Sequence, residues 1–225
     1  LTRPDIIDAG EIMNPLSTSG RGPMAPATVF VVDDDAGIRV GLERLLRSAG
    51  YVTQAFPSAE AFLAGARPDI EACLVLDVTM PGLDGLGLQA ALAARDWTIP
   101  IVFLTGRDEI PISVRAMKHG AVNFLTKPVE DAVLFEAIEE ALARAATHHR
   151  DRGELATLRA RFDTLTPREK EVMRLVVTGR LNKQIAGELG AAEKTIKVHR
   201  ARVMQKMQVR SVAELVRVAD RLGLQ

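Results

Sequence analysis

Four short apolar runs, each ending in a polar or charged residue, constrain the fold of this chain most. The runs cover residues 29–32, 73–76, 101–104 and 122–125, and they lead into Asp33, Asp77, Thr105 and Thr126-Lys127. Runs of this length and composition are typical of strands buried on both faces of a parallel sheet. Their carboxyl ends meet at one edge, where open parallel sheets bind ligands. Charges at that edge are costly unless they bind something, so the pattern predicts a site there.

Helical patterns separate these strands. Ile38, Leu42, Leu45 and Leu46 recur at helical spacing, and Gly50 follows as a C-cap glycine would. The expected elements are strands over 28–33, 51–56, 72–77, 99–104 and 121–126, with further helices over 58–66, 85–95, 109–119 and 130–146. Five such units predict an α/β doubly wound five-stranded parallel sheet over residues 28–146.

Charge divides the 225 residues into two halves, although the formal net charge is zero. Residues 28–146 hold 10 Lys and Arg against 17 Asp and Glu, a balance of −7. Residues 164–225 hold 13 Lys and Arg against 6 Asp and Glu, a balance of +7. This asymmetry predicts two domains, the first suited to cations and the second to a polyanion.

Composition favours a reducing, cytoplasmic setting. The single cysteine, Cys73, excludes an internal disulfide framework and is expected to be a small core residue. No apolar run approaches the ~20 residues that span a bilayer, so no membrane association is expected.

The segments outside the two halves carry weaker signals. Residues 1–27 are rich in Pro, Ser and Gly and are predicted to be a disordered tail. The chain begins with Leu, and Met24 lies just before the first strand, so whether 1–23 belong to the native protein is left open. Residues 147–163 are charged and helix-prone, which predicts a semi-rigid helical linker in which Gly153 stands between the preceding helix and a second helical stretch.

Residues 164–225 are predicted to be entirely helical. Thr164 or Thr166 can cap a helix whose first turn holds Pro167 and Glu169. A short helix over 182–189, a turn at Gly190 and a longer helix over about 192–207 follow, and Ser211 caps a last helix. This order is a helix-turn-helix signature in a small all-α domain.

The acidic edge suits phosphoryl chemistry. Asp33, Asp34 and Asp77 repel one another unless a divalent cation such as Mg²⁺ binds between them. Lys127 can pair with a phosphoryl oxygen, and Thr105 can donate a hydrogen bond to another. Phosphoryl transfer needs mainly positioning and charge neutralisation, and the attacking group would be the Asp77 carboxylate.

Residues 28–146 resemble a response-regulator receiver domain of flavodoxin-like fold. The matching motifs are Val32-Asp33-Asp34-Asp35, Leu76-Asp77-Val78-Thr79-Met80-Pro81-Gly82, Leu104-Thr105-Gly106 and Thr126-Lys127-Pro128. The resemblance implies phosphorylation of Asp77 and a Mg²⁺ site of Asp33, Asp34, Asp77 and the Thr79 carbonyl, with Asp34 as a direct ligand. It also implies switch roles for Thr105, Lys127 and Phe124, and a cis Lys127–Pro128 peptide bond. From the residues themselves, Asp35 is expected to cap the first helix, and simple core packing remains an equal possibility for Phe124.

Residues 164–225 resemble the LuxR-type helix-turn-helix of NarL/FixJ regulators. The matching runs are Leu165-Thr166-Pro167-Arg168-Glu169, Asn182-Lys183-Gln184-Ile185-Ala186 and Lys194-Thr195-Ile196-Lys197-Val198-His199-Arg200. Lys197 and Val198 match base-contacting positions, whereas Ala201 stands where relatives often carry a basic residue. Candidate DNA contacts elsewhere are Lys194, Asn182, Lys183, Thr195, Arg200 and Lys206, and His199 is left between a packing role and a phosphate contact.

Together the two resemblances imply a two-component response regulator. A sensor histidine kinase would phosphorylate Asp77, and homodimers would then bind a two-fold site on double-stranded DNA and regulate transcription, activation being favoured. Alternatives are a small phosphatase or phosphotransferase, a constitutive or partner-controlled DNA-binding protein, and an adaptor whose C-terminal helices only dimerise. No separate substrate pocket or general base is evident, so an enzyme is not expected. The kinase, the stimulus, the promoter and the phosphate lifetime are not encoded in any recognisable motif.

Overall fold

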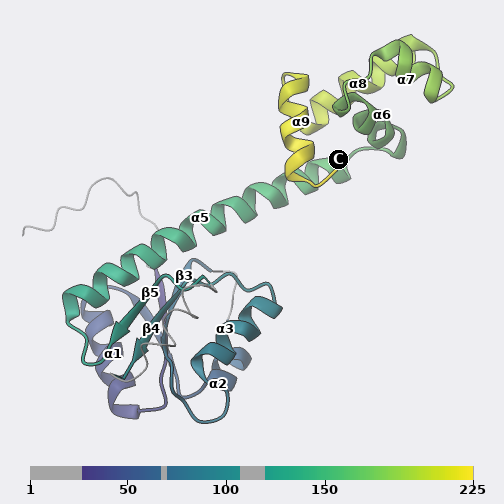
Figure 1. The fold of residues 1–225 in the computed structure, drawn as a ribbon. Coiled ribbons are helices and arrows are strands. Elements are labelled where there is room, and N and C mark those ends of the chain that lie inside the picture. Colours follow the sequence, from purple (N-terminus) through teal and green to yellow (C-terminus); the bar gives the residue numbers. More distant parts are fainter. Residues whose placement is uncertain (1–26, 67–69, 107–119, 225) are drawn as a thin grey trace, which may run out of the picture.

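The computed structural model describes residues 27–66, 70–106 and 120–224. The expected helix over 109–119 and nearly all of the expected tail lie outside these ranges. Five parallel strands form one sheet in the order β2-β1-β3-β4-β5. Their bounds are Thr28–Val32, Val52–Phe56, Ala72–Asp77, Ile101–Thr105 and Asn123–Thr126 for β1 to β5. The predicted doubly wound parallel sheet is therefore confirmed (Figure 1).

Helices cover both faces of this sheet because alternate strand residues point to opposite sides. On one face, Phe30, Leu74 and Phe103 pack with Phe62 of α2 (Ala59–Gly65) and Leu88 of α3 (Gly85–Ala94). On the other, Val31, Val75 and Val102 pack with helices α1 (Ala36–Ser48) and α5 (Asp131–Asp163), which contribute Leu42, Leu46, Leu134 and Ile138. Cys73 is fully buried in this second layer, as expected, and burial raises the pKa of its thiol to about 12.

Helix α5 is one continuous helix of 33 residues. Its first turns bury Leu134, Ile138 and Leu142 against the sheet, and its last turns bury Leu158 and pack Phe162 against the C-terminal helices. Every residue from 147 to 154 is exposed. The predicted helical linker is thus part of a single rod, with Gly153 inside it rather than between two helices (Figure 1).

The C-terminal helices form a separate core at the far end of α5 (Figure 1). They are α6 (Pro167–Val177), α7 (Asn182–Glu188), α8 (Glu193–Met207) and α9 (Val212–Arg221). Thr166, rather than Thr164, caps α6, and it forms a reciprocal capping box with Glu169. Ile196, Val203 and Met207 of α8 are buried as predicted, and Ser211 caps α9.

Candidate functional site

The carboxyl ends of β1 and β3 bring three aspartates together. Asp77 is the last residue of β3, and Asp33 and Asp34 directly follow β1. One carboxylate oxygen of each lies within 4.8 Å of those of the other two. Asp33 and Asp77 are 1% and 8% exposed, whereas Asp34 is open to solvent. The predicted acidic cluster is therefore present, and one of its members remains accessible from outside.

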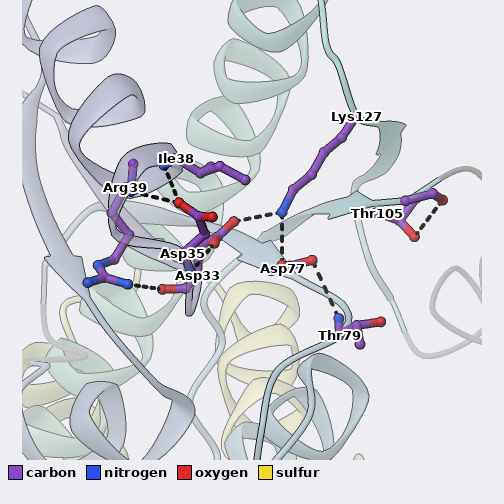
Figure 2. A network of polar contacts seen from close by, with 10 residues as sticks. Asp33, Asp35, Ile38, Arg39, Asp77, Thr79, Thr105 and Lys127 are labelled. Carbon is purple, nitrogen blue, oxygen red and sulfur yellow. Dashed lines mark hydrogen bonds and ion pairs between the residues drawn. The ribbon is translucent and has the colours of Figure 1, made fainter.

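Lys127 bridges the two buried aspartates (Figure 2). Its ammonium lies 2.7 Å from Asp33 Oδ2 and 2.8 Å from Asp77 Oδ2. Burial lowers the pKa of Lys127, but its hydrogen bonds with the two carboxylates outweigh this effect and raise the pKa overall. Burial also raises the pKa of Asp77, and the hydrogen bond from Lys127 only partly offsets the rise. The lysine thus remains a cation next to carboxylates that are deprived of water.

The β1–α1 connection fixes Asp33 from two sides. Arg39 donates from Nη1 to the main-chain carbonyl of Asp33 at 2.7 Å, and the Asp33 carboxylate accepts from the amide of Asp35 at 2.8 Å. Asp35 caps α1 by accepting from the amides of Gly37 and Ile38, as predicted (Figure 2). These two hydrogen bonds lower the pKa of the Asp35 carboxyl. Asp35 is thus a structural member of the acidic run.

The β3–α3 connection is held just as closely. A Cβ atom on Gly85 would lie 2.4 Å from the Asp77 carbonyl oxygen, so only glycine allows α3 to begin this near β3. Glu60 of α2 accepts from the amide of Leu83 at 3.1 Å. Thr79 donates its amide to Asp77 Oδ1 at 3.4 Å. Asp84 caps α3 through the amide of Gly87, which accounts for this additional carboxylate near the site.

The two expected switch residues lie on neighbouring strands. Thr105 ends β4, is 1% exposed, and its hydroxyl donates to the carbonyl of Gly106 at 3.2 Å (Figure 2). Phe124 of β5 is half-buried, and its ring centroid lies 5.9 Å from that of Phe103. The Lys127–Pro128 peptide bond is cis, as the resemblance implied. Thr105 therefore shares the sheet edge with the aspartates, whereas Phe124 contacts the core.

The donor set fits a hard divalent cation. Three carboxylates with oxygens within 4.8 Å of one another provide the ligand type that Mg²⁺ prefers, and the exposed Asp34 leaves room for water ligands. One ammonium faces two buried carboxylates and an exposed third, so the cluster holds an excess of negative charge. Additional positive charge would therefore stabilise it.

The predicted DNA-contacting residues gather around α8 and the start of α7. Lys194, Thr195, Lys197, Val198 and Ala201 are exposed on α8. Arg200 donates to the side chain of Asn182 at 3.1 Å, which joins the middle of α8 to the start of α7. Lys183 is exposed beside Asn182. The exposed surface thus holds Lys183, Lys194 and Lys197 together with Val198, which is 45% exposed. Such a surface is compatible with the major groove of DNA, which is flanked by phosphates.

Three structural contributions were not evident from sequence. Arg39 and Glu60 support the loops around the aspartates, although each resembles an ordinary helix-surface charge in the sequence. Lys206, considered as a phosphate contact, instead donates to Glu169 Oε2 at 2.6 Å and to the Thr164 carbonyl at 3.0 Å. The sequence indicated only that Glu169 could take part in a capping box at the start of α6, and it gave no sign that Lys206 would pair with it.

A sheet edge with this aspartate–lysine cluster, joined by a helix to a helix-turn-helix, defines the class of two-component response regulators. Residues 29–139 match the response regulator receiver domain, and residues 163–219 match the bacterial regulatory proteins of the luxR family. Nodulation protein W of Bradyrhizobium diazoefficiens is 48% identical over 88% of this chain and 87% of its own length. Transcriptional regulatory protein FixJ of the same organism is 44% identical over 87% of this chain and 96% of its own.

Solved structures agree with these relatives. Response regulator StyR matches with a TM-score of 0.76 and 50% identity, over 88% of this chain and 100% of that one. Full-length FixJ from B. japonicum matches with a TM-score of 0.52 and 42% identity, over 88% and 98%. The chain belongs to the family of FixJ-type response regulators, in which a receiver domain is joined to a LuxR-type DNA-binding domain. This is a family of transcriptional regulators and not typically of enzymes. None of the helices in the described ranges combines the length and apolarity needed to cross a membrane.

Proposed function

We propose that this regulator is switched by phosphorylation of Asp77 and then binds DNA as a homodimer. The observation that carries the proposal is the contact of Lys127 with both Asp33 and Asp77 beside Asp34, because it places a cation and two further carboxylates around the carboxylate of Asp77 at the edge of the sheet. A sensor histidine kinase supplies the phosphoryl group, as is typical of the family.

Asp77 is the phosphoryl acceptor. A carboxylate oxygen of Asp77 attacks the phosphorus of a phosphohistidine, the phosphorus–nitrogen bond breaks, and the imidazole leaves with the bonding electron pair and takes up a proton. The product is an aspartyl phosphate. Lys127 then exchanges a carboxylate partner for a phosphoryl oxygen, and the hydroxyl of Thr105 donates to another. Asp33, Asp34, Asp77 and the carbonyl of Thr79 would hold Mg²⁺, which would neutralise charge on the carboxylates and the incoming group.

The switch acts through the β4–β5 edge. Recruitment of Thr105 to the phosphoryl group removes its hydroxyl from the Gly106 carbonyl and favours a second packing of Phe124 beside Phe103. The same edge provides the surface for homodimer formation. Two copies of the C-terminal domain then contact two half-sites, which gives a selectivity that one domain lacks.

In the DNA-binding half, Lys197 and Val198 contact base edges. Asn182, Lys183, Lys194, Thr195 and Arg200 contact the backbone, with Arg200 and Asn182 orienting each other. Ala201 offers only an apolar contact such as a thymine methyl group. A cytoplasmic protein with this surface binds double-stranded DNA more tightly at low salt.

The test compares three full-length proteins with and without Mg²⁺ and beryllofluoride. They are the wild type, Asp77→Asn, and Asp84→Asn as a matched control, because Asn preserves the cap of α3 and Asp84 lies outside the cluster. Light scattering measures the molar mass, and a titration with a DNA pool selected by the wild type measures affinity. Wild type and Asp84→Asn are expected to dimerise and gain affinity with the phosphoryl mimic, and Asp77→Asn is expected to do neither.

Two outcomes favour other functions. Equal DNA binding by all three proteins, with no response to the mimic, would support a constitutive regulator. Phosphoryl-dependent dimers without salt-dependent DNA binding would support the adaptor alternative.

A further inference from the structure

His199 occupies a boundary position on the recognition helix α8. Ile196 and Val203 of α8 are buried and Val198 is exposed, whereas His199 is half-buried. Successive residues of a helix are about 100° apart, so His199 lies to one side of the buried row, on the flank that also carries Thr195, Arg202 and Lys206. On this flank, Lys206 contacts Glu169 of α6, whereas Thr195 and Arg202 are exposed to solvent.

The two ring nitrogens of His199 have different surroundings. Nδ1 is buried and has no hydrogen-bond partner among the described residues. Nε2 likewise forms no hydrogen bond with the described part of the chain, but it differs from Nδ1 in that it is not buried. The Nε2 edge of the ring is therefore in contact with solvent. One nitrogen faces inward without a partner, and the other faces outward and can bind.

This arrangement determines the tautomer. A proton on Nδ1 would be a buried donor without an acceptor, which proteins avoid more strictly than a buried lone pair. The proton of the neutral ring accordingly resides on Nε2, which makes His199 a single outward donor. Packing of the inner half of the ring fixes the direction of this donor, so little conformational freedom is lost on binding.

We propose that His199 Nε2–H donates to a phosphate oxygen of DNA as a positioning contact. The inference rests on the proposed DNA-binding function. A helix in the major groove presents its flanks to the sugar–phosphate backbone, and backbone oxygens only accept hydrogen bonds. Thr195 and Arg202, on the same flank, provide a hydroxyl and a cation next to His199. The contact fixes the depth and register of α8 while Lys197 and Val198 contact bases.

A matched pair of variants isolates the donor. Gln in His199→Gln keeps an N–H donor on a side chain of comparable reach, and Met in His199→Met has similar volume without a donor. Each full-length variant is titrated, with Mg²⁺ and beryllofluoride, against two duplexes of unrelated sequence, because a phosphate contact acts on any sequence. Salt is varied between about 50 and 200 mM. Lys194→Gln provides the comparison, because it removes a positive charge from a proposed backbone contact.

His199→Met is expected to weaken binding to both duplexes by the same factor, about 3- to 10-fold, and His199→Gln is expected to restore most of it. The slope of affinity against salt should stay at the wild-type value for both variants, since every Lys and Arg is retained, whereas Lys194→Gln should reduce it by about 1. Equal binding by His199→Met and wild type overturns the proposal, as does a loss in His199→Gln as large as in His199→Met. A changed slope contradicts a contact that acts through the hydrogen bond alone.

A second measurement needs no variant. Nitrogen-15 spectra of histidine-labelled wild-type protein should show the proton of His199 on Nε2, and addition of DNA should shift the Nε2 resonance more than that of Nδ1. A proton on Nδ1, or equal shifts of both nitrogens, contradicts the assignment. If the wild type binds neither duplex in a salt-dependent way, the DNA-binding function itself fails. A failure confined to His199 leaves wild-type binding and the effect of Lys194→Gln intact.

Discussion

Lys206→Met tests how the DNA-binding domain is stabilised. Glu169 is 2% exposed and accepts from Lys206 Nζ at 2.6 Å and from the amide of Thr166 at 2.9 Å. Among the described residues, removing Lys206 leaves the buried carboxylate with hydrogen bonds from Thr166 alone. A hydrogen bond to a charged group contributes about 1.5–3 kcal/mol. The Lys206 side chain is 34% exposed, so water replaces part of the interaction, and we expect a loss of about 2 kcal/mol.

Hydrogen exchange is the suitable assay for Lys206→Met, because the single Trp and Tyr of the chain lie in the receiver half and do not report on α6–α9. A loss of about 2 kcal/mol makes the slowest amides of α6 and α8 exchange about 30-fold faster, while amides of the sheet are unchanged. Lys194→Met removes the same charge from an exposed position on α8 and serves as the control. If the two variants exchange alike, the buried pair contributes nothing and the reasoning fails.

The effect of Lys206→Met also has a pH signature. The hydrogen bond from Lys206 holds the pKa of the Glu169 carboxyl below its ordinary value, against the opposing effect of burial. A carboxyl with a lowered folded-state pKa contributes stability that is complete above about pH 4.3 and is lost as the pH falls through the folded-state pKa. The difference between wild type and Lys206→Met is therefore expected to be constant between about pH 5 and 8 and to shrink below about pH 4. A difference that grows with acidity contradicts this sign.

Substitutions at three positions test local structure. Gly153→Ala should stabilise the exposed middle of α5 by about 1 kcal/mol, measured as slower exchange there, because a helical Gly costs that much relative to Ala. Gly179→Ala should destabilise instead, because Gly179 has a φ of +82°. Leu181→Ser should raise the stability of the C-terminal domain by about 0.5–1 kcal/mol, read from denaturant-dependent exchange, because Leu181 is 67% exposed at the N-cap of α7 without a side-chain cap. Leu181→Ala, which gains no cap, should change little.

The sheet and its acidic edge could be predicted because the residues that specify them are neighbours in the sequence. An apolar strand followed at once by Asp33 or Asp77 fixes both the burial of the strand and the edge at which the carboxylate emerges. Capping is equally local, so Asp35 and Ser211 were placed correctly. Gly153 shows the limit of such reasoning, since anchoring of α5 at both ends outweighs the intrinsic preference of one glycine.

Pairings between distant residues could not be predicted. Lys206 and Glu169 are 37 positions apart, and Arg200 and Asn182 are 18 apart, so neither pair leaves a periodic signal. The difference between the two nitrogens of His199 depends on how deeply one flank of α8 packs. Sequence identifies residues capable of binding phosphate, but only packing reveals which of them, like Lys206, are used internally.

The continuity of α5 connects the two halves physically. The helix packs on β3 and β4, the strands that end in Asp77 and Thr105, and the same helix carries Leu158 and Phe162 to the C-terminal core. Its far end is fixed further by Arg221 Nη2, which lies 2.9 Å from Glu154 Oε2. A rotation of α5 against the sheet therefore turns α8 as well, except where α5 bends in its exposed turns from 147 to 153. Stiffening those turns with Gly153→Ala should strengthen the dependence of DNA binding on the state of Asp77, because less of the rotation is lost to bending. Unchanged coupling in Gly153→Ala would mean that the signal reaches the DNA-binding domain through dimer formation alone.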